Sequence, residues 1–404
     1  VVYTFIPGLT LDVGLGIRYG SGFSKSFTQG LLMGLTSEDA AGASRGGAES
    51  TYLANTNILT YKKLFDGKHD LTLTAVNEQT KEIYENFSVT ANGLLFPVFE
   101  YHNLSLLTEN GQLQGNAWYG ERKIRSFVGR ASYVYNNKYH LSASVRRDGS
   151  SVFRGDNVWA NFPSFSAGWT ISEESFMQND VIDNLKLRAS WGKTGNQAVG
   201  IYGTQGQLKT SPPMDISTSF VNGEATAGLI MGDPGNQDLK WETTEQINVG
   251  LDVALFNRLS LSADYFNKNT YDLLIYMPIP SYAGGGGMNQ NVGEVRNSGL
   301  EFVLNADVIS NAEWHWSTNF NATFLHNEIT KLGREEFGLG YNGGGEGLEF
   351  IVREGESISS FYGLTYLGTW KESEAALAAV YNAVPGDARF KDFQSEGEEG
   401  YGVI

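Results

Sequence analysis

The chain has 404 residues, with 29 Lys and Arg against 45 Asp and Glu, and a formal net charge of −16. This acidity excludes a nucleic-acid backbone as the main partner, because there is no basic surface to release counterions. The sequence holds no cysteine, which excludes disulfides, cysteine-ligated metals and thiol nucleophiles. Its 49 glycines and its aromatic share of 13% are typical of β-structure.

No run of about 18 apolar residues occurs, so the sequence predicts no transmembrane helix. A membrane crossing would therefore have to use the strands of a β-barrel. The chain opens at Val1 within a strand pattern and without a leader sequence, and we interpret it as an internal piece of a longer protein.

In chain order, the first predicted strands are joined by a long connection over 20–51, a short one at 63–68 and a long one over 81–120. The first of these contains Gly42-Ala-Ser-Arg-Gly46, which matches the Gly-x-Ser-x-Gly pattern of a nucleophile elbow. An elbow needs a buried strand before it and a helix after it. Because Ser44 lies in a polar stretch of small residues over 36–50, we expect a loop here.

From residue 139 onward, apolar and polar residues alternate over segments of about ten residues. Tyr139, Leu141, Ala143 and Val145, for example, alternate with His140, Ser142, Ser144 and Arg146. Each such segment predicts a strand with one apolar face and one polar face. The other segments are 164–171, 185–191, 247–253, 259–265, 300–307 and 314–324.

Two architectures produce such strands: a soluble β-sandwich with one wet face, and a membrane barrel whose polar face points inward. The segment lengths favour the barrel, because a tilted spanning strand needs about 9–11 residues and soluble strands average about five or six. Rings at the ends of the apolar faces also favour it, since amphipathic rings prefer the headgroup level. These rings are Tyr133, Tyr135, Tyr139, Trp169, Trp191, Tyr265, Trp314 and Trp316.

The connections alternate in length, as in outer-membrane barrels with short periplasmic turns and long outer loops. Those at 136–138, 256–258 and 309–312 are short, and those at 193–240, 269–297 and 327–347 are long. By parity the connection at 173–184 is periplasmic, although it is longer than a tight turn. We predict about a dozen strands of an all-β, antiparallel transmembrane barrel. Secreted tandem β-sandwiches that bind carbohydrate remain the alternative.

Candidate binding residues follow from this arrangement. Arg146, Arg147 and Asp148 end a predicted strand where a long loop begins. They are expected to form a polar rim that orients a ligand or a plug inside the barrel, or register-fixing ion pairs worth at most about 1 kcal/mol each. Arg188 and Asp252 are expected to face the lumen. Rings in or beside the outer loops are expected to stack on sugars or to contact a protein partner. These are Trp159, Trp241, Tyr271, Tyr276 and Tyr282.

Histidines His69, His102, His140, His315 and His326 show no metal-ligand spacing. We also find no set of nucleophile, base and orienting group that would converge. The sequence therefore predicts no catalytic residue, no cofactor and no metal site, and the protein is not expected to be an enzyme.

Several motifs are more specific than the alternation. They occur in the order Val145-Arg-Arg-Asp-Gly-Ser-Ser151, Phe162-Pro-Ser-Phe-Ser-Ala-Gly-Trp169, Leu185-Lys-Leu-Arg-Ala-Ser-Trp-Gly-Lys-Thr-Gly-Asn-Gln197, Asp238-Leu-Lys-Trp-Glu-Thr-Thr-Glu-Gln246 and Asn297-Ser-Gly-Leu-Glu301. The chain closely resembles the SusC/RagA family of TonB-dependent outer-membrane transporters. The resemblance covers about 57–387 and is dense between 121 and 308.

The resemblance implies a plugged barrel of about 22 strands. It implies active import of an oligomeric nutrient, glycan or peptide, across the outer membrane of a Gram-negative bacterium. A SusD-like surface lipoprotein and TonB would be partners, outer-membrane lipid would surround the barrel, and transporter–lipoprotein pairs could dimerise. Residues 1–404 would be a partial barrel, without the plug domain, the TonB box or the closing strands. The substrate is not readable from the sequence.

One stretch departs from the family. After Pro385-Gly-Asp387 the family usually carries Asp-x-Asn-Gly-Asp-Gly, whereas this chain has Lys391-Asp-Phe-Gln-Ser-Glu-Gly-Glu-Glu-Gly400. Glu396, Glu398 and Glu399 could offer oxygens to calcium, but the loop register is lost. We therefore do not predict a calcium site in this loop.

Overall fold

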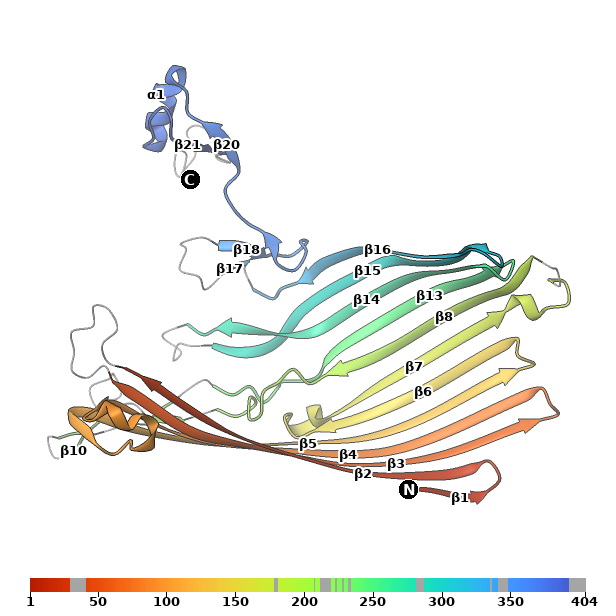
Figure 1. Ribbon diagram of the computed structural model, residues 1–404, viewed down its shortest axis with the longest axis horizontal. Helices are drawn as coiled ribbons and strands as arrows, with labels where there is room; N and C mark the ends of the chain where they lie inside the picture. Colours follow the sequence, from red (N-terminus) through yellow and green to blue (C-terminus); the bar gives the residue numbers. More distant parts are fainter. Residues whose placement is uncertain are drawn as a thin grey trace. The chain divides into compact units, whose positions relative to one another are not determined.

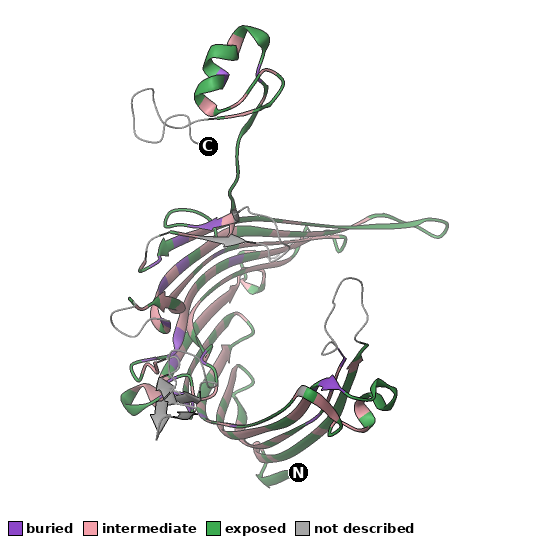
Figure 2. Ribbon diagram, turned by 90° about the vertical axis from the view of Figure 1, so that its left-hand side faces the viewer, coloured by how far each residue is buried: buried purple, intermediate pink, exposed green. Residues whose placement is uncertain are grey.

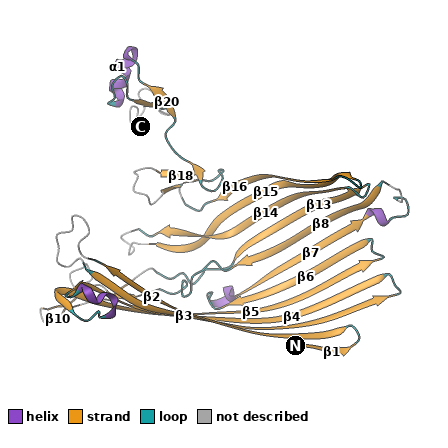
Figure 3. Ribbon diagram, in the orientation of Figure 1, coloured by secondary structure: helices purple, strands orange, loops and turns teal. Residues whose placement is uncertain are grey.

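The computed structural model describes residues 1–29, 41–177, 181–206, 208–210, 219–221, 224–226, 229–231, 234–280, 287–334, 336–340 and 348–391. The chain divides into two compact units, Val1–Leu325 and His326–Ile404. Most of the described chain is β-strand (Figures 1 and 3).

The first unit is built on one sheet of twelve strands in which each strand pairs with its neighbours along the chain. Every pairing with a defined register is antiparallel. The strands are β1 (Val2–Ile6), β2 (Leu9–Thr28), β3 (Gly42–Phe65), β4 (His69–Leu94), β5 (Leu107–Tyr135), β6 (Tyr139–Ser150), β7 (Trp159–Thr170), β8 (Ile182–Asn196), β13 (Glu242–Leu255), β14 (Leu259–Pro278), β15 (Gly287–Ser310) and β16 (His315–Lys331).

Smaller elements lie in the connections and in the second unit. The connections carry β9 (Leu208–Thr210), β10 (Ser219–Val221), β11 (Glu224–Thr226), β12 (Leu229–Met231) and the 3-10 turns η2 (Pro97–His102), η3 (Gly155–Val158) and η4 (Ile171–Glu173). The second unit contains β17 (Phe337–Gly340), β18 (Leu348–Val352), β19 (Ser360–Phe361), β20 (Tyr366–Thr369), β21 (Ala388–Phe390), α1 (Ala375–Ala378), η6 (Glu372–Glu374) and η7 (Ala379–Tyr381). Across the described ranges, no helix combines the length and the hydropathy needed to cross a bilayer.

The exposure pattern of the sheet is inverted relative to a soluble protein. On β6, Leu141 and Val145 are 44% and 50% exposed, whereas the polar residues between them are half-buried. On β13, Ile247, Val249 and Leu251 are all exposed. The sheet of the first unit curves into an arc (Figure 2). Curvature spreads side chains on the convex face and crowds them on the concave face, so the apolar residues lie on the convex side and the polar residues on the concave side.

The register shows that this division extends across the sheet. One row of paired residues runs His69, Tyr135, Tyr139, Trp169, Leu187, Leu251, Ala263 and Phe302. The adjacent row on the other face runs Asp70, Val134, His140, Gly168, Arg188, Gly250, Asp264 and Glu301. We call the convex apolar side the outer face and the concave polar side the inner face.

Among the described residues, no second sheet covers the apolar side of these strands. The described residues form only two small buried clusters, one around Phe153 and Trp241 and one around Ala91 and Leu94, and both lie at strand ends. A sandwich would instead bury the apolar faces against each other. The tandem-sandwich alternative is therefore wrong, and the partial transmembrane barrel is confirmed.

One end of the sheet, the turn end, carries the short connections. Asp66 and Gly67, Asn136 and Asn137, and Phe256 and Asn257 are consecutive pairs with positive φ, as type I′ hairpin turns require. The other end, the loop end, carries the connections at 29–41, 95–106, 151–158, 197–241 and 279–286. The short connections predicted at 136–138, 256–258 and 309–312 and the long one predicted at 193–240 are confirmed. The long connection predicted over 269–297 is wrong, because β14 continues to Pro278 and β15 begins at Gly287, and β16 likewise continues to Lys331. The connection after β7, over 171–181, is longer than the other connections of the turn end.

The lengths of the early strands differ from the prediction. Much of 20–51 and of 81–120, expected as loops, is strand, because β3, β4 and β5 contain 24, 26 and 29 residues. Ser44 accordingly lies within β3, where its hydroxyl is 2.7 Å from that of Ser26. The strand backbone continues well beyond the apolar part of the outer face, because the ladder between neighbours does not depend on side-chain polarity.

The turn end has an ordered set of rings. Tyr139 stacks between Tyr135 and Trp169, with centroid distances of 6.3 and 6.4 Å. Glu174, just after η4, accepts hydrogen bonds from Lys138 Nζ at 2.8 Å, from the Tyr139 hydroxyl at 2.7 Å and from Trp169 Nε1 at 3.2 Å. The longer connection after β7 thus supplies the carboxylate that fixes these rings. The predicted position of rings at the end of the apolar face is confirmed here.

We predict that the Glu174 carboxylate stays ionised, and so keeps its hydrogen bonds, when the pH falls below the usual pKa of a glutamate. The hydrogen bond from Lys138, with that from Tyr139, lowers the pKa of the Glu174 carboxyl to about 2. A carboxyl whose pKa is lower in the folded state stabilises the fold above its unfolded pKa, and this contribution is lost as the pH falls toward the folded pKa. The difference in unfolding free energy between the protein and Glu174→Gln should be constant above about pH 5 and shrink toward pH 2. A difference that does not vary over this range would contradict the assignment.

We also predict that the two faces tolerate charge differently. Leu251→Arg on the outer face should cost about 2–4 kcal/mol near a bilayer midplane and impair insertion. Ser190→Arg, on the inner face of the neighbouring strand, is the matched control and should insert normally. Urea titration in lipid vesicles and heat-modifiable gel mobility would measure both. Equal loss in the two variants would contradict the assignment of the faces.

Candidate functional site: the polar inner face

The middle of the inner face is organised around Arg188 on β8. Its guanidinium donates to Asp252 at 3.0 and 3.3 Å, to Asp264 at 2.6 Å and to the Ser262 hydroxyl at 3.1 Å. Gly250 makes this possible, because a Cβ there would lie 2.6 Å from Arg188 Cζ and 2.5 Å from Asp264 Oδ1. The arginine side chain therefore lies flat along the wall and links three strands.

A polar hollow of about 370 Å³ lies beside Arg188. A row of paired hydroxyls crosses it, formed by Ser132, Ser142, Ser166 and Ser190. Lys186, Arg188 and Arg130 add positive charge along its lining. The hollow therefore offers small hydroxyl groups and longer basic side chains as hydrogen-bonding partners.

A second network lies closer to the loop end. Arg146 Nε is 2.8 Å from both oxygens of Asp148, and its Nη2 donates to Ser126 at 2.9 Å and to Glu78 at 3.4 Å. Asp148 and Ser126 are buried. The network joins β4, β5 and β6, which fits the register-fixing interpretation and leaves the guanidinium partly accessible on the inner face.

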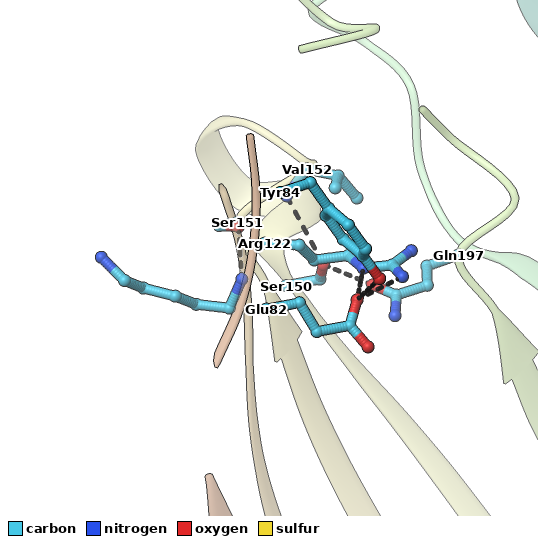
Figure 4. Close-up of polar contacts among 8 residues, drawn as sticks. Glu82, Tyr84, Arg122, Ser150, Ser151, Val152 and Gln197 are labelled. Atoms are coloured by element: carbon cyan, nitrogen blue, oxygen red, sulfur yellow. Dashed lines mark hydrogen bonds and ion pairs between the residues drawn. The ribbon is translucent and has the colours of Figure 1, made fainter. Parts of the chain in front are cut away.

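A third network continues this wall toward the loops (Figure 4). Arg122 Nε and Nη2 donate to Glu82 Oε2 at 2.9 and 2.5 Å, and the Tyr84 hydroxyl donates to the same oxygen at 3.2 Å. Nearby, the buried Ser150 hydroxyl donates to Gln197 Oε1 at 2.5 Å. This last contact connects the end of β6 to the segment that follows β8.

The loop end also has a small apolar core. Trp241 lies 5.0 Å from Phe153 and 5.7 Å from Phe162 between ring centroids, and Leu239 is fully buried beside them. Thr204 donates to the Val152 carbonyl at 3.1 Å. The core therefore ties the connection after β6 to the residues that precede β13.

The predicted rings have different surroundings. Trp241 is only 7% exposed, because this ring, expected to contact a ligand, packs in the small apolar core. Trp159 and Tyr276 are exposed. Tyr271 donates to Glu245. Tyr282 lies outside the described residues. A ligand or partner role for each of them stays a prediction.

The charged predictions divide between the two faces. Arg188 with Asp252, and Arg146 with Asp148, are brought together on the inner face. Arg147 points to the outer face, where its guanidinium lies 5.4 Å from the centre of the Trp159 ring. Of the three residues predicted to form a polar rim, Arg146 and Asp148 therefore share the inner face and Arg147 does not, because consecutive residues of a strand point to opposite faces. A rim role for Arg147 stays a prediction.

Sequence reasoning missed several residues that organise this site. Glu242 is buried and accepts hydrogen bonds from Asn196 at 2.8 Å and from the Leu274 backbone at 3.0 Å. Asn291 donates to the carbonyls of Lys240 and Asp272 at 2.9 and 2.7 Å. Glu242 belongs to the motif that begins at Asp238. That motif supports the family resemblance, but the sequence alone assigns no physical role to Glu242.

Among the described residues, no group of three or more His, Asp or Glu side chains could hold a metal ion. His69 Nδ1 lies 2.7 Å from the Tyr133 hydroxyl, and His140 Nε2 lies 3.0 Å from that of Thr170. Glu396, Glu398 and Glu399 lie outside the described residues. The inner face offers guanidinium, carboxylate and hydroxyl groups, which bind polar molecules by hydrogen bonds and ion pairs.

The inverted sheet and its polar inner face define the wall of a membrane β-barrel. A family model described as "TonB dependent receptor-like, beta-barrel" matches residues 2–404. The chain is 35% identical over 415 residues to TonB-dependent receptor P3 of Formosa agariphila, covering 98% of this chain and 39% of that protein. It is 29% identical over 367 residues to TonB-dependent receptor SusC of Bacteroides thetaiotaomicron, covering 88% and 34%.

Solved structures agree. The structure of the RagAB peptide transporter matches with a TM-score of 0.78 and 26% identity, covering 91% of this chain and 39% of that one. The chain belongs to the TonB-dependent receptor β-barrel family, and the predicted resemblance to its SusC/RagA branch is confirmed. It spans about two fifths of the length of the first of these curated relatives.

We predict that Trp241 holds the loop end closed. Trp241→Ala should remove about 3–5 kcal/mol of local stability, the usual cost of truncating a buried tryptophan. Limited proteolysis should then cut the backbone near 152–158 and 236–241 faster than in the unaltered protein. Trp314→Ala is the control, since that ring is 70% exposed in the short connection between β15 and β16 and should leave cleavage unchanged. Equal protection in Trp241→Ala would contradict the proposed packing role.

Proposed function

We propose that the receptor containing this chain is an active transporter of the outer membrane of a Gram-negative bacterium. It imports oligomeric nutrients, glycan or peptide, together with a SusD-like surface lipoprotein and with energy supplied through TonB. The observation that carries this proposal is the inverted sheet, apolar on its convex face and polar on its concave face. Family membership supports the dependence on TonB.

The inner face supports a binding role without covalent chemistry. The Arg188 network and the serine row present donors and acceptors over several strands. Such a surface can hold a hydrated oligomer by many weak contacts, each of which exchanges with water at little net cost. Only the inner face and the loop end can meet such a substrate, because the outer face is committed to lipid.

The partner and substrate classes rest on the relatives. SusC is a TonB-dependent receptor by name, and RagAB is described as a peptide transporter. We extend to this protein a lipoprotein partner of the SusD type and a substrate that is either a peptide or a glycan. Pairs of transporter and lipoprotein that dimerise are part of the same proposal.

The proposal predicts that inner-face charge controls uptake. Arg188→Ala in the full-length receptor should lower uptake about tenfold, which corresponds to about 1.4 kcal/mol of lost interaction. Labelled glycan and peptide oligomers, supplied separately to cells, would show which class is imported. Surface abundance should be unchanged.

Arg296→Ala is the matched control, because Arg296 lies on the outer face of β15 and donates to Asn269 at 3.2 Å. It should leave uptake unchanged. Removal of TonB should abolish uptake in all strains. Uptake that persists without TonB, or that falls equally in both arginine variants, would overturn the proposal.

A further inference from the structure

The outer face has a basic hollow where its apolar part ends on the side of the loop end. Its volume is about 640 Å³, and it lies over two adjacent register rows. The first row runs Leu15, Asn55, Gln79, Arg125, Gly149 and Trp159, and the second runs Ile17, Leu53, Lys81 and Lys123. The hollow therefore spans strands β2 to β7 on the side that faces away from the lumen.

The lining has two chemical parts. Leu15 and Ile17, each 80% exposed, and Leu53 form an apolar part on β2 and β3. Lys81, Lys123 and Arg125 form a basic part on β4 and β5, with the Trp159 ring at the far side. An occupant that fits both parts is an amphiphile with a hydrocarbon chain and an anionic head.

The charge of this patch is opposite to that of the chain. Arg147 lies diagonally across from Arg125, so four cations gather in a protein of net charge −16. Within the described residues, Glu121 is the carboxylate that bonds to this group, through Lys81 at 2.8 Å and through Lys123. The patch keeps a clear excess of positive charge.

The two arginines are arranged to receive an anion. The Arg125 guanidinium lies 4.9 Å from the Phe127 ring centre, and that of Arg147 lies 5.4 Å from the Trp159 ring centre. Phe127 and Trp159 themselves stack at 6.2 Å. Across the described ranges neither guanidinium has a carboxylate partner. A guanidinium stacked on a ring keeps its N–H edges free, and phosphate is the anion that matches this geometry.

The position of the patch identifies the source of the anion. On β5 and β6, Arg125 and Arg147 are the first basic outer-face residues after Phe127 and Val145. This is the level of the lipid headgroups, where basic side chains meet lipid phosphates. We propose that this hollow binds a phosphate-bearing anionic lipid of the surrounding leaflet, with its acyl chain along Leu15, Ile17 and Leu53.

The inference rests on the membrane placement in the proposed function, and the two can fail separately. A receptor that stays soluble without detergent would remove the placement itself. A receptor that inserts normally but shows no preference for anionic lipid would remove only the lipid site.

The test uses the full-length receptor in phosphatidylcholine nanodiscs with and without phosphatidic acid, with bound lipid measured by native mass spectrometry. We expect retained phosphatidic acid and little retained phosphatidylcholine. Arg125→Gln/Arg147→Gln should weaken retention about thirty-fold, or about 2 kcal/mol, since each basic residue near an anionic surface contributes about 1 kcal/mol. Arg125→Lys/Arg147→Lys keeps both charges and should retain most of the lipid.

Lys193→Gln/Arg296→Gln is the matched control, because it removes two positive charges from the same face at sites that already have partners, Glu245 at 3.4 Å and Asn269 at 3.2 Å. It should retain lipid as the unaltered receptor does. Equal retention in the two glutamine double variants would overturn the site. Displacement of the lipid by millimolar inorganic phosphate would also overturn it, because the hollow would then recognise free phosphate rather than a lipid.

Discussion

Backbone hydrogen bonds between neighbouring strands hold the first unit together, with little help from a buried core. An antiparallel ladder satisfies its own donors and acceptors. The side chains of each face can therefore match the polarity of the medium that this face contacts. Curvature then gives each face a distinct role. Apolar side chains spread over the convex side, and polar side chains crowd together on the concave side and bond to one another.

The middle of the sheet could be predicted from sequence because two signals coincide there. Strict alternation gives the strands from β6 onward, and turn residues give their short connections. The same reasoning missed the halves of β3, β4 and β5 that lie toward the loop end. There the outer face carries Asn55, Gln79 and Lys81, so both faces are polar and alternation vanishes although the ladder continues. Strands that pair only through their main chains cannot be recognised from the polarity of their side chains.

The candidate site shows the same limit. Arg188 and Asp252 were predictable as inner-face residues, because they fall on the polar side of well-patterned strands. Strand parity already separates Arg146 from Arg147, and applying it at that position would have placed Arg147 outside. Trp241 was not predictable, because its burial depends on Phe153 and Phe162, which come from a distant part of the chain. A motif can therefore be specific to a family and still serve packing.

The 29 residues of β5 would extend about 95 Å at 3.3 Å per residue, about three times the hydrocarbon thickness of a bilayer. Much of this ribbon must stand in water, held upright by its neighbours. Because main-chain bonding sets its shape, the side chains of the projecting region can vary without changing the course of the ribbon. The part of the sheet that extends beyond the bilayer is thus also the part whose residues can change most without loss of form.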